Sequence, residues 1–269
     1  MTAIIDLPST TRRRVAQAGL TARGVLYCLV GLLALRIAFG GGSGQASQSG
    51  ALQTLAQQPF GTVLVALVGV GLLGYALWRF TQFFTEKGSE DNDTKNAVMR
   101  TSYIMRGIIY TGLAFVAFST AFGSGGGGGN SQQTLTAMIM KDVPGGVFLV
   151  GLVGLIIIGV GCYQGYQAFS DDFMEELRQH EMDQRMRTWV RRIGVAGHSA
   201  RAVVFTLIGI FVIRAAVQFD PQEAKGLDGA LQELSQRSYG PWLLTLVAIG
   251  LFLFGIYTLV RTRYVDVSK

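Results

Sequence analysis

The fold is decided by a short pattern that occurs three times: Arg23-Gly24-Val25-Leu26-Tyr27, Arg106-Gly107-Ile108-Ile109-Tyr110 and Arg201-Ala202-Val203-Val204-Phe205. The copies are 83 and 95 residues apart, and each one lies near the start of a long apolar run. The same two offsets carry Arg36 onto Ser119 and then onto Arg214, so the register persists through the run. Self-similarity of this kind predicts a structure built from three repeated units.

Six apolar runs are long enough to cross a lipid bilayer. Only 15% of the residues are charged, whereas about 25% is usual in a soluble chain. Each run spans the ~30 Å hydrocarbon core as a helix, which keeps its backbone amides hydrogen-bonded within the segment. The sequence therefore predicts an all-α, polytopic membrane protein with spans at about 20–39, 61–84, 103–122, 146–169, 199–218 and 242–260.

Each repeat contains two of these spans. They are joined by a Gly-rich or polar link and a short amphipathic piece, at 50–55, at 134–140 in a weaker form, and at 229–234. A proline follows near the head of each second span, at Pro59, Pro144 and Pro241, where the first turn of a helix tolerates it. Because two spans return the chain to its starting side, we expect three parallel helix-hairpin repeats with pseudo-threefold packing.

The same boundaries divide the whole chain. We expect an N-terminal arm at 1–14, repeat 1 at 15–85, a link at 86–99, repeat 2 at 100–170, an amphipathic helical link at 171–193 and repeat 3 at 194–265.

Basic residues predict the orientation in the membrane. Of the 23 lysines and arginines, 18 lie on the side of the two termini and the inter-repeat links, and five lie on the other side. The positive-inside bias therefore predicts that both termini and both links are cytoplasmic. The basic face is expected to attract anionic membrane lipids, and because topology explains the basic composition, no nucleic-acid partner is expected.

The repeated elements resemble a known family. They are the Arg-Gly-x-x-Tyr pattern, the Gly-Ala-Leu-x-x-Leu piece, and an exit with Gly74, Tyr75 and Arg79 in repeat 1 and Gly255, Tyr257 and Arg261 in repeat 3. Over about residues 14–265 the chain is similar to the bacterial membrane family called domain of unknown function 1206. The middle copy departs from the pattern, with Ser119 for the outer arginine and Gln164 or Gln167 near the exit. The resemblance implies three two-span repeats in a bacterial plasma (inner) membrane and implies no activity.

The arginines at the inner ends of the first spans are the first candidate binding residues. One interpretation is that Arg23, Arg106 and Arg201 form a basic ring that grips an anion or a lipid phosphate. Their candidate aromatic partners lie four residues on, one helical turn away, at Tyr27, Tyr110 and Phe205. The alternative is that the three arginines are interfacial anchors that snorkel to the headgroups.

Arg36 and Arg214 are the second set of candidates for anion or lipid binding. Arg36 follows Arg23 by 13 residues, about 20 Å of helix, which is shorter than the hydrocarbon core. One arginine of such a pair is therefore expected to turn into the bundle, toward a polar cavity or a carboxylate. The carboxylates considered are Asp142, Asp220, Asp228 and Glu233. The alternative is that Arg36 and Arg214 are interfacial anchors.

The longest inner link, 170–192, is predicted to be one helix. Ser170 would cap it, acidic residues stand at its start and arginines at its end. A loose apolar stripe follows the same segment: Phe173, Leu177, Met182, Met186, Trp189 and Ile193. Two alternatives remain open: a helix that either lies on the membrane surface or extends the fourth span, and a docking site for a membrane or cytoplasmic protein partner.

Several motifs argue against catalysis. Gly69 to Gly74 spells a dinucleotide-binding fingerprint, but these glycines lie inside a predicted span without the strand that the motif requires, so we interpret them as helix-packing residues. His180 and His198 have no second ligand at metal-binding spacing, and Cys28 and Cys162 are interpreted as reduced packing residues. No enzyme activity, cofactor or metal site is predicted.

The sequence favours an accessory or scaffold protein that binds lipid or a membrane partner. The alternative function is a channel or carrier for a small anion or a lipid-like solute, which would use the inward arginines. A lipid-modifying enzyme is the third and least favoured class, because the spans contain almost no carboxylates to serve as acid or base.

Overall fold

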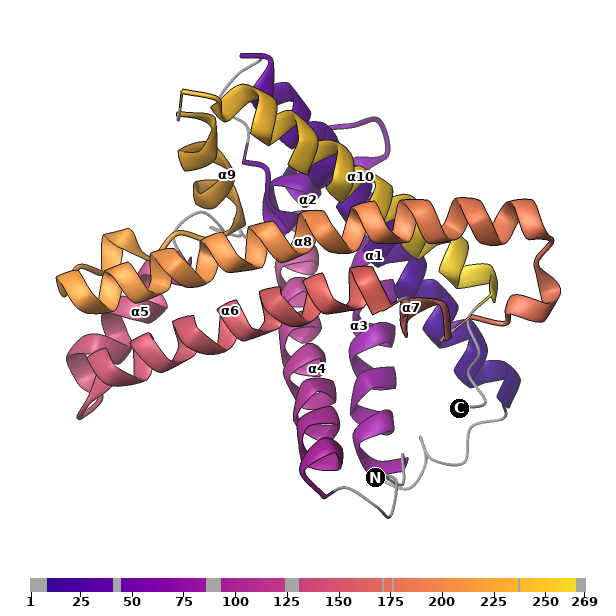
Figure 1. Ribbon diagram of the computed structural model, residues 1–269, viewed down its shortest axis with the longest axis horizontal. Coiled ribbons are helices and arrows are strands. Elements are labelled where there is room, and N and C mark those ends of the chain that lie inside the picture. Colours follow the sequence, from indigo (N-terminus) through magenta and orange to yellow (C-terminus); the bar gives the residue numbers. More distant parts are fainter. Residues whose placement is uncertain are drawn as a thin grey trace. The chain divides into compact units, whose positions relative to one another are not determined.

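The computed structural model in Figure 1 describes residues 9–40, 45–85, 93–123, 131–170, 172–175, 177–236 and 238–264. Every regular element in these ranges is a helix, and the ranges contain no strand. Six helices are long and apolar enough to cross a membrane. They are α1 (Ser9–Ala38), α3 (Gly61–Thr85), α4 (Asp93–Ala121), α6 (Gly146–Ser170), α8 (Gln184–Gln218) and α10 (Gly240–Tyr264). The prediction of an all-α protein with six candidate spans is confirmed.

Shorter helices occupy the outer segments between the two spans of each repeat. These helices are α2 (Gln48–Ala56) in repeat 1, α5 (Ser131–Asp142) in repeat 2, and η3 (Pro221–Glu223) with α9 (Leu227–Ser235) in repeat 3. The chain turns into the second span through a left-handed residue in two repeats, Phe60 at φ 60° and Gly145 at φ 73°. Glycine adopts this conformation without the steric cost that Phe60 bears. Pro59 and Pro144 precede these turns, and Pro241 lies in the first turn of α10.

The prediction of one helix over 170–192 is wrong. Ser170 ends α6, a single turn α7 (Asp172–Glu175) and a 3₁₀ turn η2 (Gln179–Glu181) follow, and α8 begins at Gln184. The Asp183 side chain accepts a hydrogen bond from the backbone of Met186 and so caps α8. Phe173, Leu177 and Met182 are buried. Burying a large apolar side chain stabilises the fold by about 1.5–3 kcal/mol. This outweighs the smaller gain from placing acidic and basic side chains at the two ends of a single helix dipole.

The chain forms two compact units, each described by itself. Unit 1 comprises Met1–Val25, Leu52–Gly126 and Thr258–Lys269, and unit 2 comprises Leu26–Ala51 and Gly127–Tyr257. The repeats and the units do not coincide. Repeat 2, for example, contributes α4 to unit 1 and α6 to unit 2.

Close helix contacts in unit 1 are made at glycines. Gly19 in α1 lies against Tyr75 in α3, so that a Cβ added there would be 2.8 Å from the Tyr75 Cα. Gly71 in α3 lies in turn against Ala18 and Ala22 of α1. Helix α4 packs along α3, which lies beside it in Figure 1. The missing side chains let the backbones approach, as helix packing in membranes requires.

In unit 2, the two spans of repeat 3, α8 and α10, make the same kind of contact as α1 and α3 make in unit 1. Gly197 in α8 lies against the Phe254 backbone of α10, and Gly250 in α10 lies against Ala196 and Ala200 of α8. Gly19 and Gly197 are related by 178 residues, the same offset that relates Arg23 to Arg201. The two first-to-second-span contacts are therefore built at equivalent positions.

Contacts between repeats also follow one rule inside the two units. The second half of α1 packs on α10 through Gly31, which lies against the Phe252 backbone, and α8 packs on α6 through Gly209, which lies against Ile158. In unit 1, α4 of repeat 2 packs on α3 of repeat 1. Inside the units, the first span of each repeat thus packs on the second span of another repeat: α4 on α3, α8 on α6, and the second half of α1 on α10.

The glycine contacts also correct one sequence alignment. Because Gly19 faces Tyr75 and Gly197 faces Phe254, the position of Tyr75 is occupied in repeat 3 by Phe254 and not by Tyr257. One turn later, Thr258 therefore corresponds to Arg79, in place of the predicted Arg261. The matched contacts of Gly31 and Gly209 place Gln164 at the same position in repeat 2. All three of these polar side chains are buried.

Candidate functional site

Two buried arginines converge on one tyrosine hydroxyl in unit 1. Arg79 Nε and Nη2 donate to the Tyr75 Oη at 2.9 and 2.7 Å, and Arg23 Nη1 donates to the same oxygen at 3.2 Å. Arg79 Nη1 also donates to Gln82 Oε1 at 2.6 Å. Tyr75, Arg79 and Gln82 stand on successive turns at the end of α3, which brings all three side chains to one end of the helix.

Aromatic rings surround both guanidinium groups. The Arg79 Cζ is 4.5 Å from the Trp78 ring centre and 5.6 Å from that of Tyr103. The Arg23 Cζ is 5.8 Å from the Tyr110 ring centre. Rings in these positions attract a cation through their negative faces and partly replace the hydration that burial removes.

Further positive charge lies close to the same tyrosine. Arg106 of α4 and Arg261 of α10 both interact electrostatically with Tyr75, in addition to Arg23 and Arg79. Arg23 and Arg79 are 8% and 3% exposed, whereas Arg106 and Arg261 are half-buried. We refer to Arg23, Arg79, Arg106, Arg261 and Tyr75 as the arginine cluster. Within the described part of the chain, Arg79 forms no ion pair.

The equivalent region of unit 2 uses an amide where unit 1 uses Arg79. Gln164 Oε1 lies 2.8 Å from His198 Nδ1 and accepts a hydrogen bond from Arg201 Nη1 at 3.2 Å. All three side chains are at least 92% buried. A neutral acceptor therefore serves two donors here, and the position adds no charge.

Aromatic side chains enclose this second region as well. The Arg201 Cζ is 4.4 Å from the Phe254 ring centre. The His198 ring stacks on Phe173 with centroids 5.1 Å apart, and Tyr257 Oη donates to the Phe173 carbonyl at 3.1 Å. The first turn after α6 is thereby fixed to α8 and α10.

The aromatic partners predicted for the inner arginines are found in part. Arg201 packs on Phe205, one turn along the same helix, with the Cζ 5.2 Å from the ring centre. Arg23 instead packs on Tyr110 of repeat 2, and Arg201 also packs on Tyr27 of repeat 1. In both cases the arginine of one repeat meets the tyrosine of the next. Arg23 and Arg106 belong to unit 1 and Arg201 to unit 2, so the predicted three-arginine ring stays a prediction.

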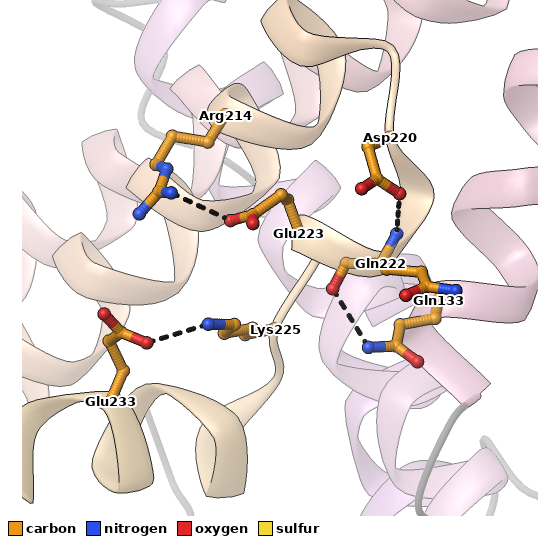
Figure 2. Close-up of polar contacts among 7 residues, drawn as sticks. All are labelled: Gln133, Arg214, Asp220, Gln222, Glu223, Lys225 and Glu233. Atoms are coloured by element: carbon orange, nitrogen blue, oxygen red, sulfur yellow. Dashed lines mark hydrogen bonds and ion pairs between the residues drawn. The ribbon is translucent and has the colours of Figure 1, made fainter. Parts of the chain in front are cut away.

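The outer arginines are less buried than Arg23 and Arg201. Arg36 is exposed, and Arg214 forms an ion pair with Glu223, with Nη2 and Oε2 3.1 Å apart and the two side chains 40% and 25% exposed. Figure 2 shows this pair beside the second ion pair of the segment, Lys225 with Glu233 at 2.8 Å. Each pair therefore anchors the outer segment of repeat 3 at a partly exposed position.

None of the four carboxylates considered for Arg214 is its partner in this ion pair. Asp220 accepts a hydrogen bond from the Gln222 backbone and caps η3, and Glu233 binds Lys225. Asp142 is the last residue of α5, and Asp228 lies in the first turn of α9. The sequence analysis missed Glu223 because the 3₁₀ turn at Pro221, which returns the chain toward α8, has no hydrophobic periodicity to reveal it. Gln222 accepts a hydrogen bond from Gln133 of α5 through its carbonyl and so ties the same turn to repeat 2.

Two of the buried polar groups near the inner ends also escaped the sequence analysis. Gln164 appeared only as a departure from a pattern, and His198 as an isolated histidine. Gln164 is identified by its position, which is equivalent to that of Arg79, and His198 by its place one turn before Arg201 on α8. The equivalence of Gln164 and Arg79 becomes visible only once the glycine contacts fix the register of the second spans.

Comparison with known proteins agrees with the repeat structure. The family model described as Domain of Unknown Function (DUF1206) matches the chain three times, at residues 18–85, 101–171 and 196–265. The chain is 34% identical over 252 residues to the "Uncharacterized protein YxxB" of Bacillus subtilis (strain 168), across 94% of this chain and 90% of that protein. No solved structure matches the chain. The chain is therefore a multi-pass membrane protein of the DUF1206 family, which it contains as three successive copies.

Proposed function

We propose that the protein is an accessory protein of the bacterial plasma membrane that binds anionic phospholipids at the arginine-rich ends of its helices. The observation that carries the proposal is the N-terminal extension of α8. Over residues 184–192 this helix exposes Arg185, Arg191 and Arg192 together with Trp189, which is 65% exposed. Arginine beside tryptophan at the end of a spanning helix is the composition that suits the headgroup layer of an anionic leaflet.

The proposal includes an orientation. The basic extension of α8, the arginine cluster and both termini would lie at the cytoplasmic leaflet, because 18 of the 23 basic residues lie on that side of the spans. The outer segments α2, α5 and α9 would face the opposite side. Each added arginine near an anionic surface contributes about 1 kcal/mol of attraction.

A protein partner at the same surface is the alternative within this class. Of the stripe predicted for 170–192, Phe173, Leu177 and Met182 are buried inside unit 2, and only Met186 and Trp189 are exposed. Two exposed apolar side chains among arginines form a small surface for a protein partner, whereas they suit insertion into a headgroup layer. We therefore favour lipid.

The carrier or channel alternative has less support. It required inward Arg36 or Arg214, and these two residues are exposed and ion-paired, respectively. A polar path through a bundle usually contains ionisable side chains at membrane depth. The buried arginines of the described residues, Arg23, Arg79 and Arg201, are instead packed against aromatic rings.

The test measures which lipids surround Trp189. A variant with Trp78→Phe and Trp242→Phe retains Trp189 as its single tryptophan, and it is reconstituted in mixed bilayers that contain either brominated phosphatidylglycerol or brominated phosphatidylcholine at equal mole fraction. We expect brominated phosphatidylglycerol to quench Trp189 more strongly, and Arg185→Gln with Arg191→Gln and Arg192→Gln to remove the difference. Equal quenching by the two brominated lipids would contradict the proposal.

A matched control uses the other end of the molecule. Trp242 is 79% exposed at the start of α10, and a variant with Trp78→Phe and Trp189→Phe keeps it as the single tryptophan. Its quenching is expected to show no preference for either lipid, because few basic residues lie on that side.

A further inference from the structure

We propose that exposed aromatic side chains at the starts of the second spans anchor the protein in the bilayer, at the boundary between the lipid headgroups and the acyl chains. The inference goes beyond the function proposed above, because it concerns the starts of α3, α6 and α10 and requires no anionic lipid. It involves none of the arginines of α8, so the two proposals fail independently.

The three second spans begin with the same turn. Phe60, Gly145 and Tyr239 occupy equivalent positions in it, because the carbonyl of each accepts a hydrogen bond from the backbone four residues later, at 3.1 Å in every repeat. Each of the three directly precedes the glycine that begins an apolar span. A Cβ on that glycine would lie within 2.2 Å of a carbonyl oxygen of α2, α5 or α9. The turn is therefore one structural position that the repeats fill with different side chains.

Two repeats place a large aromatic side chain at this turn and leave it uncovered. Phe60 is 84% exposed and Tyr239 is 76% exposed. Gly145 shows that the turn forms without a side chain at this position. Phe60 moreover has φ 60°, a conformation that glycine adopts without steric cost. Packing among the described residues therefore does not account for the aromatic rings at this turn.

The turn residues lie at the head of an exposed apolar face. Three and seven residues after the turn, the side chains are exposed in every repeat: Val63 and Leu67, Phe148 and Leu152, Trp242 and Leu246. These spacings place them on the same side of the helix as the turn residue. The start of α3 belongs to unit 1, whereas α6 and the start of α10 belong to unit 2, so the same exposure recurs in both units. The exposed face of a membrane-spanning helix lies against acyl chains, and its head lies where these chains meet the headgroups.

The composition of this end of the spans identifies the lipid boundary as the occupant. Repeat 2, which has glycine at the turn, carries the exposed ring of Phe148 three residues later, so each second span begins with an exposed ring. Aromatic side chains are enriched where hydrocarbon meets the headgroups, because their rings are apolar and tolerate a polar edge. Only five of the 23 basic residues lie on this side of the spans, so the contact does not depend on headgroup charge.

The test measures the depth of the turn in a bilayer. A full-length Phe60→Trp variant also carries Trp78→Phe, Trp189→Phe and Trp242→Phe, so that it contains a single tryptophan. It is reconstituted in phosphatidylcholine vesicles in which bromine lies near the headgroup end, at the middle or near the methyl end of the acyl chain. We expect the bromine near the headgroup end to quench the fluorescence most strongly. Absence of quenching by every brominated lipid would overturn the proposal, because water or a protein partner would then cover the turn.

Leu67→Trp in the same background is the matched control. Leu67 is 63% exposed on the same face, and seven residues of helix place it about 10 Å further along the helix axis. We expect bromine deeper in the acyl chain to quench this variant most strongly. Equal depths for Phe60→Trp and Leu67→Trp would overturn the proposal.

A second repeat keeps the test decisive if Phe60→Trp fails to fold. Tyr239→Trp, with the same three tryptophan replacements, places the single indole at the equivalent turn of repeat 3. It is expected to show the same shallow quenching as Phe60→Trp. Quenching of a folded Tyr239→Trp variant mainly from the methyl end would contradict the assignment.

Bilayer thickness distinguishes an anchor from a ring that is merely carried at this depth. An anchored ring stays at the boundary when the acyl chains are shortened, because the helix tilts or the bilayer adapts, whereas a ring without this preference moves into water. We expect the emission maximum of Phe60→Trp to be the same in short-chain and long-chain phosphatidylcholine. A shift to longer wavelength in the short-chain vesicles would contradict anchoring.

Lipid charge separates this proposal from the function proposed above. Replacing half of the phosphatidylcholine with phosphatidylglycerol is expected to leave the depth of Phe60→Trp unchanged, and so are Arg185→Gln, Arg191→Gln and Arg192→Gln together. These three substitutions are expected to abolish only the lipid preference at Trp189. A depth at the turn that requires phosphatidylglycerol or the three arginines would overturn the inference.

Discussion

Arg23 and Arg201 illustrate how a guanidinium is accommodated in a helix long and apolar enough to span a membrane. Each is 8% exposed, and each is surrounded by aromatic rings from more than one repeat. Arg36 and Arg214, thirteen residues further along the same two helices, are exposed or partly exposed. A charge buried among rings gains about 0.5–2 kcal/mol per favourable contact, which offsets part of its lost hydration, whereas the outer arginines keep their hydration.

Gln164 provides a stability test at this scale. Gln164→Leu leaves His198 and Arg201 without their shared acceptor, and a buried donor that loses its acceptor costs about 1–3 kcal/mol. We expect a lower thermal unfolding temperature in detergent. Gln167→Leu is the matched control, because Gln167 is only half-buried and bonds the exposed Tyr163 hydroxyl. A Gln164→Leu variant as stable as Gln167→Leu would show that the amide is not required.

The Arg214–Glu223 pair is expected to contribute little. The side chains are 40% and 25% exposed, and ion pairs of this exposure are worth about 0.2–1 kcal/mol. A double-mutant cycle with Arg214→Gln and Glu223→Gln, measured by equilibrium unfolding, should give a coupling free energy in this range. A coupling above about 2 kcal/mol would indicate a desolvated pair of the kind that the carrier alternative requires.

Single residues were predicted unevenly from the sequence. The positions of Arg23, Arg106 and Arg201 follow from a repeated pattern, and the Arg201–Phe205 contact follows from helical spacing. Tyr110 as a partner of Arg23 could not be predicted, because it comes from another helix of another repeat and no local spacing relates the two residues.

At the scale of helices, glycine positions set the packing. The contacts of Gly19 with Tyr75 and of Gly197 with Phe254 are equivalent in two repeats and bring the first and second spans together at their backbones. In a bilayer no hydrophobic drive holds helices together, so close packing at small residues is the main source of their association.

Gly19→Ala tests this packing. The added Cβ would lie 2.8 Å from the Tyr75 Cα, which the backbone relieves only by moving, at a cost of about 1–3 kcal/mol. Gly159→Ala is the control, because a Cβ there meets none of the described residues within 4 Å, and alanine favours a helix by about 1 kcal/mol. We expect thermal unfolding to occur at a lower temperature for Gly19→Ala and at an unchanged or higher temperature for Gly159→Ala. The reverse order would contradict the glycine contacts.

Phe173 tests the folded link between α6 and α8. Its side chain is 2% exposed and packs on His198 and against Gly194, so Phe173→Ala should destabilise this region by about 3–5 kcal/mol. We expect faster trypsin cleavage after Arg178 and Arg185. Phe169→Ala, at an 84% exposed position in α6, should cleave at the wild-type rate. Equal rates for both variants would favour the single amphipathic helix that the sequence suggested.

Helices were predicted well where length and apolarity decide, and poorly where capping does. The six spans follow from runs that are too long and too apolar for any other membrane-spanning structure. The link was predicted wrongly because its charge pattern resembles that of one helix, whereas Asp183 starts a new helix and the burial of Phe173 folds the preceding residues back.

At the scale of the whole molecule, three copies of one hairpin account for both the sequence and the pairings of helices. The family model matches three successive segments of the chain. Inside each unit, the first span of one repeat packs on the second span of the preceding repeat. The repeats differ most at the polar position of the second span, Arg79, Gln164 or Thr258. Duplication thus explains the shared fold, and the repeats diverge at one buried position of the second span.

The common direction of the three repeats is the central claim, and cysteine accessibility measures it most directly. In a variant with Cys28→Ala and Cys162→Ser, single cysteines replace the exposed Gln57, Lys141 and Gln232 between the spans of each repeat, and the exposed Thr101, His180 and Arg263 at the opposite ends. A membrane-impermeant maleimide is expected to label the first three positions in intact bacterial cells and the last three only after permeabilisation. Protection of any one of Gln57, Lys141 or Gln232 while the other two are labelled would place that repeat in the opposite sense and contradict the account.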